Sequence, residues 1–353
     1  MGLKGERVNG LETRYGLFEE VYLVSSGKFR RYHGESLLAH LTDVKTLLLN
    51  ARDLVKVVGG TITARRLLKK LKPTVVFSKG GYAVVPVGIA AHGLGIPIVT
   101  HDSDTLPGLA NRIIGRWASV HATGMPTEYY SYPKSKMRYT GIPVVSQFDS
   151  VSLSDKEEYK KQLAIPTPST VLMVAGGGQG SRTVNNMVIN SASQLFVDVP
   201  QLFIIHLSGK TLEHEVKTGY GENLNEACRA RVRVVGFTDE LYKFSAASDL
   251  VVARTGASTL AELAMQGRAV VAVPSPFLSG GHQLKNAEML KKQHAAEIAH
   301  EDIPPEDFTK LITRLLNDKS ARQLLATNLH ALAKPHAARD IAQILLNFAS
   351  KDQ

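Results

Sequence analysis

The chain has 353 residues, a net charge of +10 and one cysteine, and 44% of its residues are hydrophobic while 21% are charged. These values are typical of a globular protein of about two domains, so they exclude a disordered or fibrous chain. The single cysteine, Cys228, excludes a disulfide framework and a multi-cysteine metal site.

The elements expected in the first half follow one another as strands and helices. Their residue ranges are a strand at 20–24, helices at 36–57 and 61–71, a strand at 74–78, a helix at 86–94 and a strand at 96–100. This order predicts a parallel sheet covered by helices. Residues 141–168 are rich in Pro, Ser, Lys and Asp, so we place an N-terminal domain at 1–145 and a linker at 146–168.

After the linker the alternation starts again. The expected strands are 170–174, 202–206, 232–235, 249–253 and 269–274. One helix is expected at 258–266, and two others are expected to begin near residues 183 and 283. A second domain therefore spans 169–333, and a C-terminal helix at 334–353 is expected to pack back on the first domain. The predicted fold class is α/β, with two Rossmann-like, doubly wound parallel-sheet domains facing a cleft beyond the carboxyl ends of their strands.

The positive charge is concentrated at the start of the chain. Residues 1–80 carry 15 Lys and Arg against 7 Asp and Glu, a balance of +8, whereas the rest of the chain carries only +2. Such a basic portion indicates a face that meets anions, and the alternative is a solvated face without a partner. We find no membrane span and no signal peptide in the sequence, so any membrane contact is expected to be peripheral, and no nucleic-acid module is found.

Residues 176–181 (GGGQGS) follow the first strand of the second domain and open a helix. Glycines there let backbone N–H groups approach an anion, and the helix N-terminus adds partial positive charge. The segment predicts a diphosphate site, although it has neither a Walker A lysine nor the GxGxxG spacing. A plain tight turn is the alternative.

Two later segments also open helices. Glu262 lies one turn into the helix that follows residues 254–257, and its two carboxylate oxygens suit the vicinal diol of a ribose. Gln283 and Asn286 share a helix face and could direct their amides into the cleft. The alternatives are a capping box that only starts a helix and an exposed polar helix start.

In the first half, Lys79–Tyr82 and His101–Asp104 follow strands. Asp102 and Asp104 could accept a proton from a substrate hydroxyl, and the alternative is a helix N-cap cluster, above all for Asp104. Neither a hydrolase triad nor a metal site is predicted.

Together these motifs resemble the bacterial lipid-linked N-acetylglucosaminyltransferases of peptidoglycan synthesis, the MurG type of glycosyltransferase family 28. The segments that carry the resemblance are Gly80–Tyr82, 101–104 with Gly108 and Asn111, 140–144, GGGQGS at 176–181, 236–239, RTGASTLAEL at 254–263 and HQLKNA at 282–287. The resemblance implies a GT-B architecture and an inverting transfer of GlcNAc from UDP-GlcNAc to undecaprenyl-diphospho-MurNAc-pentapeptide, with no metal and no cofactor. A donor-binding scaffold without activity, or a related GT-B enzyme with another lipid acceptor, are the alternatives.

The resemblance also assigns residues. Those implied to bind the donor UDP-GlcNAc are Asp104, Gly177, Gly178, Gln179, Gly180, Thr238, Ala257, Ser258, Thr259, Leu260, Ala261, Glu262 and Gln283. Those implied on the acceptor side are Gly80, Gly81, Tyr82 and Asn111. The first half is implied to lie on the anionic cytoplasmic face of the cell membrane, as a peripheral protein.

Three features depart from the family pattern. The family opens with a strand and a glycine-rich loop that ends in Gly-His and supplies the proposed base, whereas no such segment precedes Gly2 in the printed sequence. Asp102 or Asp104 is therefore the expected base. Val145 stands where the family usually has an arginine at the diphosphate, and Gly178 replaces a usual serine.

Overall fold

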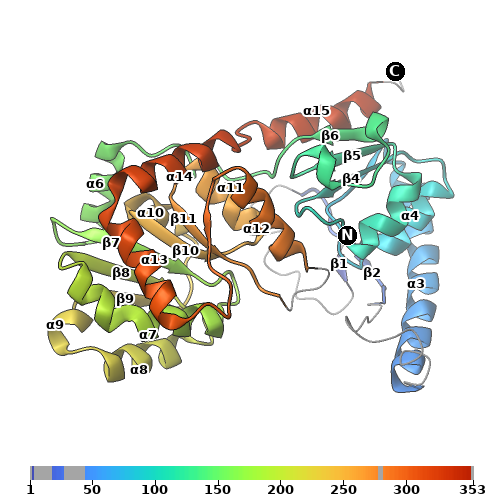
Figure 1. Ribbon diagram of the computed structural model, residues 1–353. Helices are drawn as coiled ribbons and strands as arrows, with labels where there is room; N and C mark the ends of the chain where they lie inside the picture. Colours follow the sequence, from blue (N-terminus) through green and yellow to red (C-terminus); the bar gives the residue numbers. More distant parts are fainter. Residues whose placement is uncertain (1, 4–17, 28–43, 277–280, 351–353) are drawn as a thin grey trace. The chain divides into compact units, whose positions relative to one another are not determined.

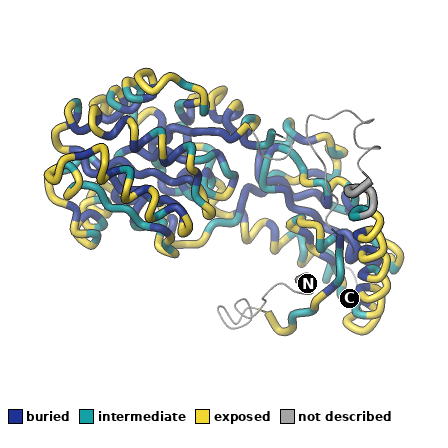
Figure 2. The backbone as a smooth tube through the Cα atoms, turned by 90° about the horizontal axis from the view of Figure 1, so that it is seen from below, coloured by how far each residue is buried: buried dark blue, intermediate teal, exposed yellow. Residues whose placement is uncertain are grey.

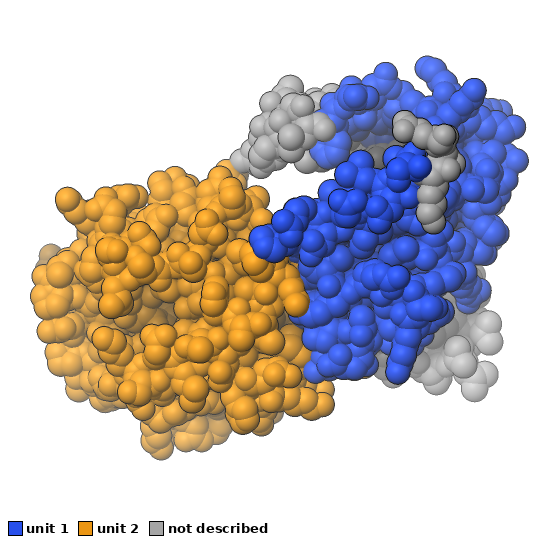
Figure 3. All heavy atoms as spheres, turned by 90° about the horizontal axis from the view of Figure 1, so that it is seen from above, with its two compact units in different colours: residues 1–141, 336–353 blue, residues 142–335 orange. Residues whose placement is uncertain are grey.

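The computed structural model describes residues 2–3, 18–27, 44–276 and 281–350 (Figure 1). The chain divides into two compact units, which Figure 3 distinguishes by colour. Unit 1 consists of residues 1–141 and 336–353, and unit 2 consists of residues 142–335. The first part of the helix expected at 36–57 lies outside the described residues.

Unit 1 contains a four-stranded, wholly parallel sheet in the order β3-β4-β5-β6. Its strands are β3 (Val76–Ser78), β4 (Ile98–Asp102), β5 (Val120–Thr123) and β6 (Met137–Tyr139). A separate parallel pair is formed by β1 (Gly2–Leu3) and β2 (Leu23–Val24), and the α-helices are α3 (Val44–Leu71), α4 (Val84–His92), α5 (Leu109–Ile114) and α15 (Ala337–Ala349). The sequence analysis did not predict β5 and β6, which are short and carry polar residues.

Helix α3 corrects the expectation of two helices at 36–57 and 61–71, because it runs without a break through Gly59 and Gly60. These glycines suggested a break, since glycine disfavours a helix interior by about 1 kcal/mol relative to alanine. The structure gives Gly60 a packing role instead. A Cβ added there would lie 1.8 Å from the carbonyl oxygen of Ser25 and 3.3 Å from Cβ of Pro86. The glycine thus lets α3 approach the segment after β2 and helix α4 closely.

Unit 2 is built on a six-stranded parallel sheet in the order β12-β11-β10-β7-β8-β9. The strands are β7 (Thr170–Ala175), β8 (Leu202–Leu207), β9 (Val232–Val235), β10 (Leu250–Arg254), β11 (Val270–Val273) and β12 (Glu297–Ile298). Helices cover both faces, so the central strands are almost continuously apolar and buried (Figure 2). The expectation of Rossmann-like, parallel-sheet halves is confirmed.

The helices of unit 2 include one inside the expected linker. They are α6 (Leu153–Gln162), α7 (Arg182–Asp198), α8 (Glu213–Asn223), α9 (Glu226–Arg229), α10 (Leu241–Ala247), α11 (Ala257–Met265), α12 (His282–Lys292), α13 (Pro305–Asn317) and α14 (Lys319–Ala331). Helix α6 begins at a capping box in which Ser152 and Asp155 exchange side-chain and backbone hydrogen bonds. The rings of Phe148 and Tyr159 pack edge-on against Tyr242 of α10. Residues 148–162 therefore belong to the packed body of unit 2.

The strand order of unit 2 reverses between β7 and β10. The first three strands run outward from β7 in one direction, and the next three run outward from β10 in the other. In an open α/β sheet, the loops at the carboxyl ends of the two strands at such a switch point diverge and leave a crevice for a ligand. The loops concerned here are residues 176–181 and 255–256.

Candidate functional site

The loop after β7 is shaped by its glycines. Gly177 has φ +88° and Gly180 has φ +78°, and Gly180 donates its N–H to the carbonyl oxygen of Gly177 at 2.9 Å. A Cβ on Gly180 would lie 2.2 Å from the carbonyl oxygen of Ser208. Gly178 differs, because its φ is not left-handed and a Cβ there would meet nothing within 4 Å. The loop is tightly held at its ends and open at its tip, where Gln179 is exposed.

The loop ends on Ser181, which joins it to the neighbouring strand. The Ser181 hydroxyl accepts a bond from the N–H of Val184 at 3.4 Å and caps α7. The same oxygen accepts from Nη2 of Arg254 at 2.6 Å. Arg254, the last residue of β10, also forms a half-buried ion pair of 2.5 Å with Glu301. The sequence analysis did not predict this ion pair, because Glu301 lies 47 positions further along the chain.

Four of the expected donor-site residues line one small hollow. Gly177, Gly178, Thr238 and Thr259 contribute to it, and the remaining lining residues are Ala175, Leu207, Gly209, Gly236, Phe237 and Leu241. These residues come from the carboxyl ends of β7, β8 and β9, from the loops that follow them, and from the starts of α10 and α11. The hollow is mostly apolar and narrow, which suits the face of a flat ring.

Glu262 lies one helical turn beyond Thr259 on α11. Burial raises the pKa of its carboxyl to about 7. Within the described residues this carboxylate has no hydrogen-bond or ion-pair partner. It is therefore an acceptor without a donor, next to the switch point. On the same helix Ala257 and Leu260 are buried, Ala261 is half-buried and Ser258 is exposed.

Gln283 and Asn286 fix the start of α12 against two strands. The Gln283 side-chain oxygen accepts from the N–H of Ser275 at 2.9 Å, and Asn286 donates to the carbonyl oxygen of Thr255 at 3.0 Å. Thr255 in turn donates its hydroxyl to the carbonyl oxygen of Gln283 at 2.9 Å. Both amide side chains are buried, so they are not the exposed helix start that was the alternative interpretation.

In unit 1, Asp102 ends β4 inside a buried polar cluster. Its two carboxylate oxygens accept from Nδ2 of Asn111 and from the hydroxyl of Tyr132, each at 2.9 Å. Asn111 also accepts from the Ser78 hydroxyl at 2.8 Å and donates to the carbonyl oxygen of His101. Burial raises the pKa of Asp102, and the bonds from Asn111 and Tyr132 oppose that shift.

The other expected residues of unit 1 lie around this cluster. Gly80 and Gly81 have φ of +87° and +82° and form the turn after β3, and the Tyr82 side chain is 38% exposed. Asp104 is half-buried, and its carbonyl oxygen accepts from the Tyr130 hydroxyl at 2.8 Å. Asp104 is thus more accessible to a substrate than Asp102.

We expect Asp102→Ala to lower the free energy of unfolding by about 2 kcal/mol, because it leaves the buried donors of Asn111 and Tyr132 without an acceptor. Urea denaturation followed by circular dichroism measures this. Asp104→Ala is the comparison, with a smaller expected loss. An unchanged stability of Asp102→Ala would contradict this structural role.

The fold and the site together define a class: a two-unit, parallel-sheet α/β protein with a small, mostly apolar hollow near the switch point of its second unit. Residues 24–123 match the glycosyltransferase family 28 N-terminal domain, and residues 171–344 match the C-terminal domain of that family. The chain belongs to glycosyltransferase family 28.

Two curated relatives carry the same name, UDP-N-acetylglucosamine--N-acetylmuramyl-(pentapeptide) pyrophosphoryl-undecaprenol N-acetylglucosamine transferase. The protein of Symbiobacterium thermophilum is 30% identical over 316 residues, which cover 87% of this chain and 81% of that protein. The protein of Sorangium cellulosum is 33% identical over 287 residues, which cover 81% of this chain and 68% of that protein.

Solved structures agree with this fold. The crystal structure of Acinetobacter baumannii MurG has a TM-score of 0.67 and 26% identity, and the match covers 84% of this chain and 79% of the other. The structure of S. aureus MnaA with UDP has a TM-score of 0.61 at 12% identity, with 82% of this chain and 80% of the other covered, and shows the shared fold alone. The expected family and GT-B architecture are confirmed.

Proposed function

We propose that this protein transfers GlcNAc from UDP-GlcNAc to undecaprenyl-diphospho-MurNAc-pentapeptide, a step of peptidoglycan synthesis. Family membership supports a sugar transfer, and the names of the relatives support this donor and this acceptor. The observation that carries the proposal in the structure is the unpartnered Glu262 carboxylate beside the β7–β10 switch point.

In the proposed donor site, Glu262 accepts hydrogen bonds from the two ribose hydroxyls. The uracil ring lies in the hollow beside Thr238, and the diphosphate lies at the tip of the 177–180 loop. The backbone N–H groups of the exposed residues Gly178 and Gln179, together with the start of α7, stabilise its negative charge. The Gln283 amide nitrogen, whose side-chain oxygen is held by Ser275, is directed to the sugar hydroxyls.

The proposed chemistry is a single inverting displacement. The acceptor hydroxyl oxygen forms a bond to the anomeric carbon, the bond from that carbon to the UDP oxygen breaks on the opposite face, and a base takes the hydroxyl proton. Between the two expected bases, Asp104 fits better, because it is half-buried and accessible to a substrate, whereas Asp102 is buried. We propose that the reaction needs no metal and no cofactor, so activity is expected to survive excess chelator.

We further propose that unit 1 contacts the anionic cytoplasmic face of the membrane. Helix α3 exposes an apolar stripe of Leu54, Val55, Val58 and Ile62, with exposed fractions between 50% and 71%. Its C-terminal part carries Arg65, Arg66, Lys69 and Lys70. Apolar side chains beside basic ones are typical of peripheral binding to anionic lipid. None of the helices in the described part of the chain has the length and apolarity that a membrane crossing requires.

The test is transfer of labelled GlcNAc from UDP-GlcNAc to a detergent-dispersed, lipid-linked MurNAc-pentapeptide acceptor, with the product identified by mass. We expect a single addition that Asp104→Asn reduces strongly. Donor binding without transfer would instead support a scaffold. Transfer only to a different lipid acceptor, in a parallel screen, would support a related enzyme with another acceptor.

A further inference from the structure

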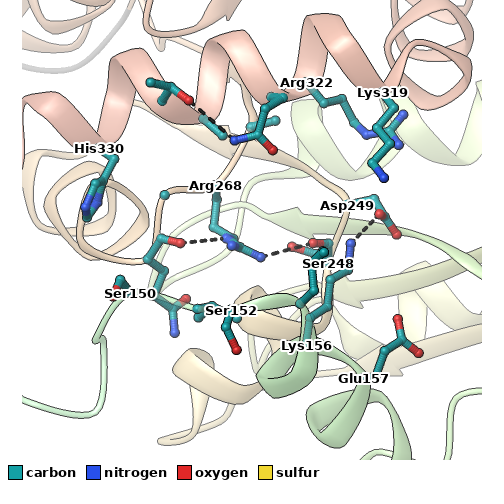
Figure 4. Close-up of a pocket in the computed structure, with 18 of the residues that line it drawn as sticks. Ser150, Ser152, Lys156, Glu157, Ser248, Asp249, Arg268, Lys319, Arg322 and His330 are labelled. Carbon is teal, nitrogen blue, oxygen red and sulfur yellow. Dashed lines mark hydrogen bonds and ion pairs between the residues drawn. The ribbon is translucent and has the colours of Figure 1, made fainter.

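A second cavity, of about 640 Å³, lies in unit 2 at the opposite end of the sheet from the switch-point loops (Figure 4). Ser248 and Asp249, which directly precede β10, line it, and so do Arg268 and Ala269, which directly precede β11. All strands of this sheet are parallel, so their amino ends and carboxyl ends form separate faces. The proposed donor site does not include this cavity.

The lining of the cavity is strongly basic. Its cationic residues are Lys156, Lys160, Arg268, Lys319 and Arg322, and its acidic residues are Glu157 and Asp249. Both acids are already paired with lysines of α6. Asp249 forms an ion pair with Lys156 and accepts a hydrogen bond from the N–H of Val171 at 2.8 Å. Oε1 of Glu157 lies 3.0 Å from Nζ of Lys160.

Three cations therefore remain without an acidic partner within 4 Å in the described part of the chain: Arg268, Lys319 and Arg322. Arg322 uses one nitrogen to donate to the last carbonyl groups of α13. A surplus of three positive charges around one hollow is unfavourable unless an anion or water neutralises it.

Arg268 is the most constrained of these cations. Its Nε donates to the carbonyl oxygen of Gln266 at 3.0 Å, and its Nη1 donates to that of Ala246 at 3.1 Å. Among the described residues Nη2 has no partner. Burial lowers the pKa of Arg268 to about 10, against the opposing effect of Asp249, so the guanidinium stays charged at neutral pH. The chain thus keeps a half-buried, oriented positive charge, and Nη2 of its guanidinium remains available to donate a hydrogen bond.

The opposite walls supply further donors. Figure 4 shows Lys319 on α14 and Lys156 on α6 extending into the same space, with the serines Ser150 and Ser152 below Arg268. A planar guanidinium, an ammonium and a hydroxyl around one space match the oxygens of a phosphate group. The volume lies in the range of small-ligand pockets and exceeds what a single phosphate needs.

We propose that this cavity is a second anion site, which binds a diphosphate-sized, phosphate-bearing ligand by Arg268 and Lys319, independently of the donor site. A soluble nucleotide and a phospholipid head group share this chemistry. The proposal is separate from the transfer reaction and would stand if that reaction had another acceptor.

The test is calorimetric titration of inorganic pyrophosphate into the full chain and two charge-reversal variants. Lys319→Glu removes a cation of the cavity, whereas Lys310→Glu changes the net charge equally at an exposed lysine of α13 outside the lining. We expect Lys319→Glu to bind at least about tenfold more weakly and Lys310→Glu to bind like the unmodified protein. Lys319 is the first residue of α14 after the cap Asp318, so an acidic residue there is compatible with the helix.

No pyrophosphate binding by the unmodified protein would overturn the proposal, and so would an equal loss in both variants. Binding that Lys319→Glu leaves intact would place pyrophosphate elsewhere and overturn it as well. A parallel sedimentation with phosphatidylglycerol and phosphatidylcholine vesicles separates the two sources. If association with the anionic vesicles depends on Lys319, the ligand is a lipid head group. If pyrophosphate binds but the vesicles do not associate through Lys319, the ligand is soluble.

Discussion

Glu262→Gln is expected to weaken UDP-GlcNAc binding by about 10- to 100-fold, because hydrogen bonds to a charged acceptor contribute roughly 1.5–3 kcal/mol. The carboxylate accepts from both ribose hydroxyls in the proposed site, whereas an amide offers only one acceptor oxygen. Calorimetry with the two forms of the protein measures the difference. Glu288→Gln, at an exposed position of α12, is the matched control and should bind normally.

A ligand lacking one hydroxyl sharpens this experiment. With 2′-deoxyuridine diphosphate-GlcNAc, the unmodified protein should lose affinity, and Glu262→Gln should lose little more. The two losses overlap because they remove the same hydrogen bond. Fully additive losses would show that Glu262 does not contact the ribose.

The pH dependence gives a further expectation for the same residue. Burial raises the pKa of Glu262 to about 7, so the carboxyl is increasingly protonated, and no longer a two-oxygen acceptor, as the pH falls below that value. Affinity for UDP-GlcNAc should therefore fall by up to about tenfold per pH unit below pH ~7 and be flat above it. The diphosphate of this donor is a diester and does not titrate there. Glu262→Gln should show a flat profile.

A measurement of stability distinguishes a loss of donor affinity in Glu262→Gln from a loss of folded protein. The folded-state pKa of Glu262 lies above the ordinary glutamate value of 4.5, so ionisation of this buried group disfavours the folded state once the pH exceeds the unfolded pKa. At pH ~8 Glu262→Gln should be at least as stable as the unmodified protein. A weaker donor affinity in a protein of equal or greater stability cannot come from misfolding.

The sequence predicted unit 2 well because its strands are short apolar runs followed by glycine loops. Five of its six strands coincide with predicted runs, at 170–174, 202–206, 232–235, 249–253 and 269–274, whereas the two-residue β12 and the strand order that creates the switch point were not predicted. The sequence analysis expected two helices where α3 is one. The close approach of Gly60 to Ser25 joins segments far apart in the chain, so the sequence around Gly60 does not reveal it.

Long-range polar contacts escaped prediction for the same reason. Arg254 and Glu301 are far apart in the chain and meet only because β10 and β12 end at the same edge of the sheet. The basic cavity combines α6, α14 and the segments before β10 and β11, none of which forms a motif alone. The capping box at Ser152 was a local signal that could have revealed α6 inside the expected linker.

The second large effect concerns the stability of the loop after β7. Gly180→Ala is expected to lower the free energy of unfolding by about 3 kcal/mol or more, because φ +78° strains any other residue and the new Cβ would lie 2.2 Å from the Ser208 carbonyl oxygen. Gly177→Ala has the same backbone strain without a clash, so a loss of about 1 kcal/mol in the free energy of unfolding is expected. Urea denaturation followed by circular dichroism measures both losses.

Gly178→Ala is the matched control within the same loop, and it should change stability by less than about 0.5 kcal/mol, because its Cβ enters open space. Equal losses for Gly178→Ala and Gly180→Ala would contradict the loop geometry. Gly178→Ser fits the same open space and places a hydroxyl at the proposed diphosphate position, so donor affinity should hold or increase. The tip of this loop therefore accommodates changes that act on the ligand, whereas Gly180 accepts no side chain, because it packs against Ser208 and Gly209 after β8.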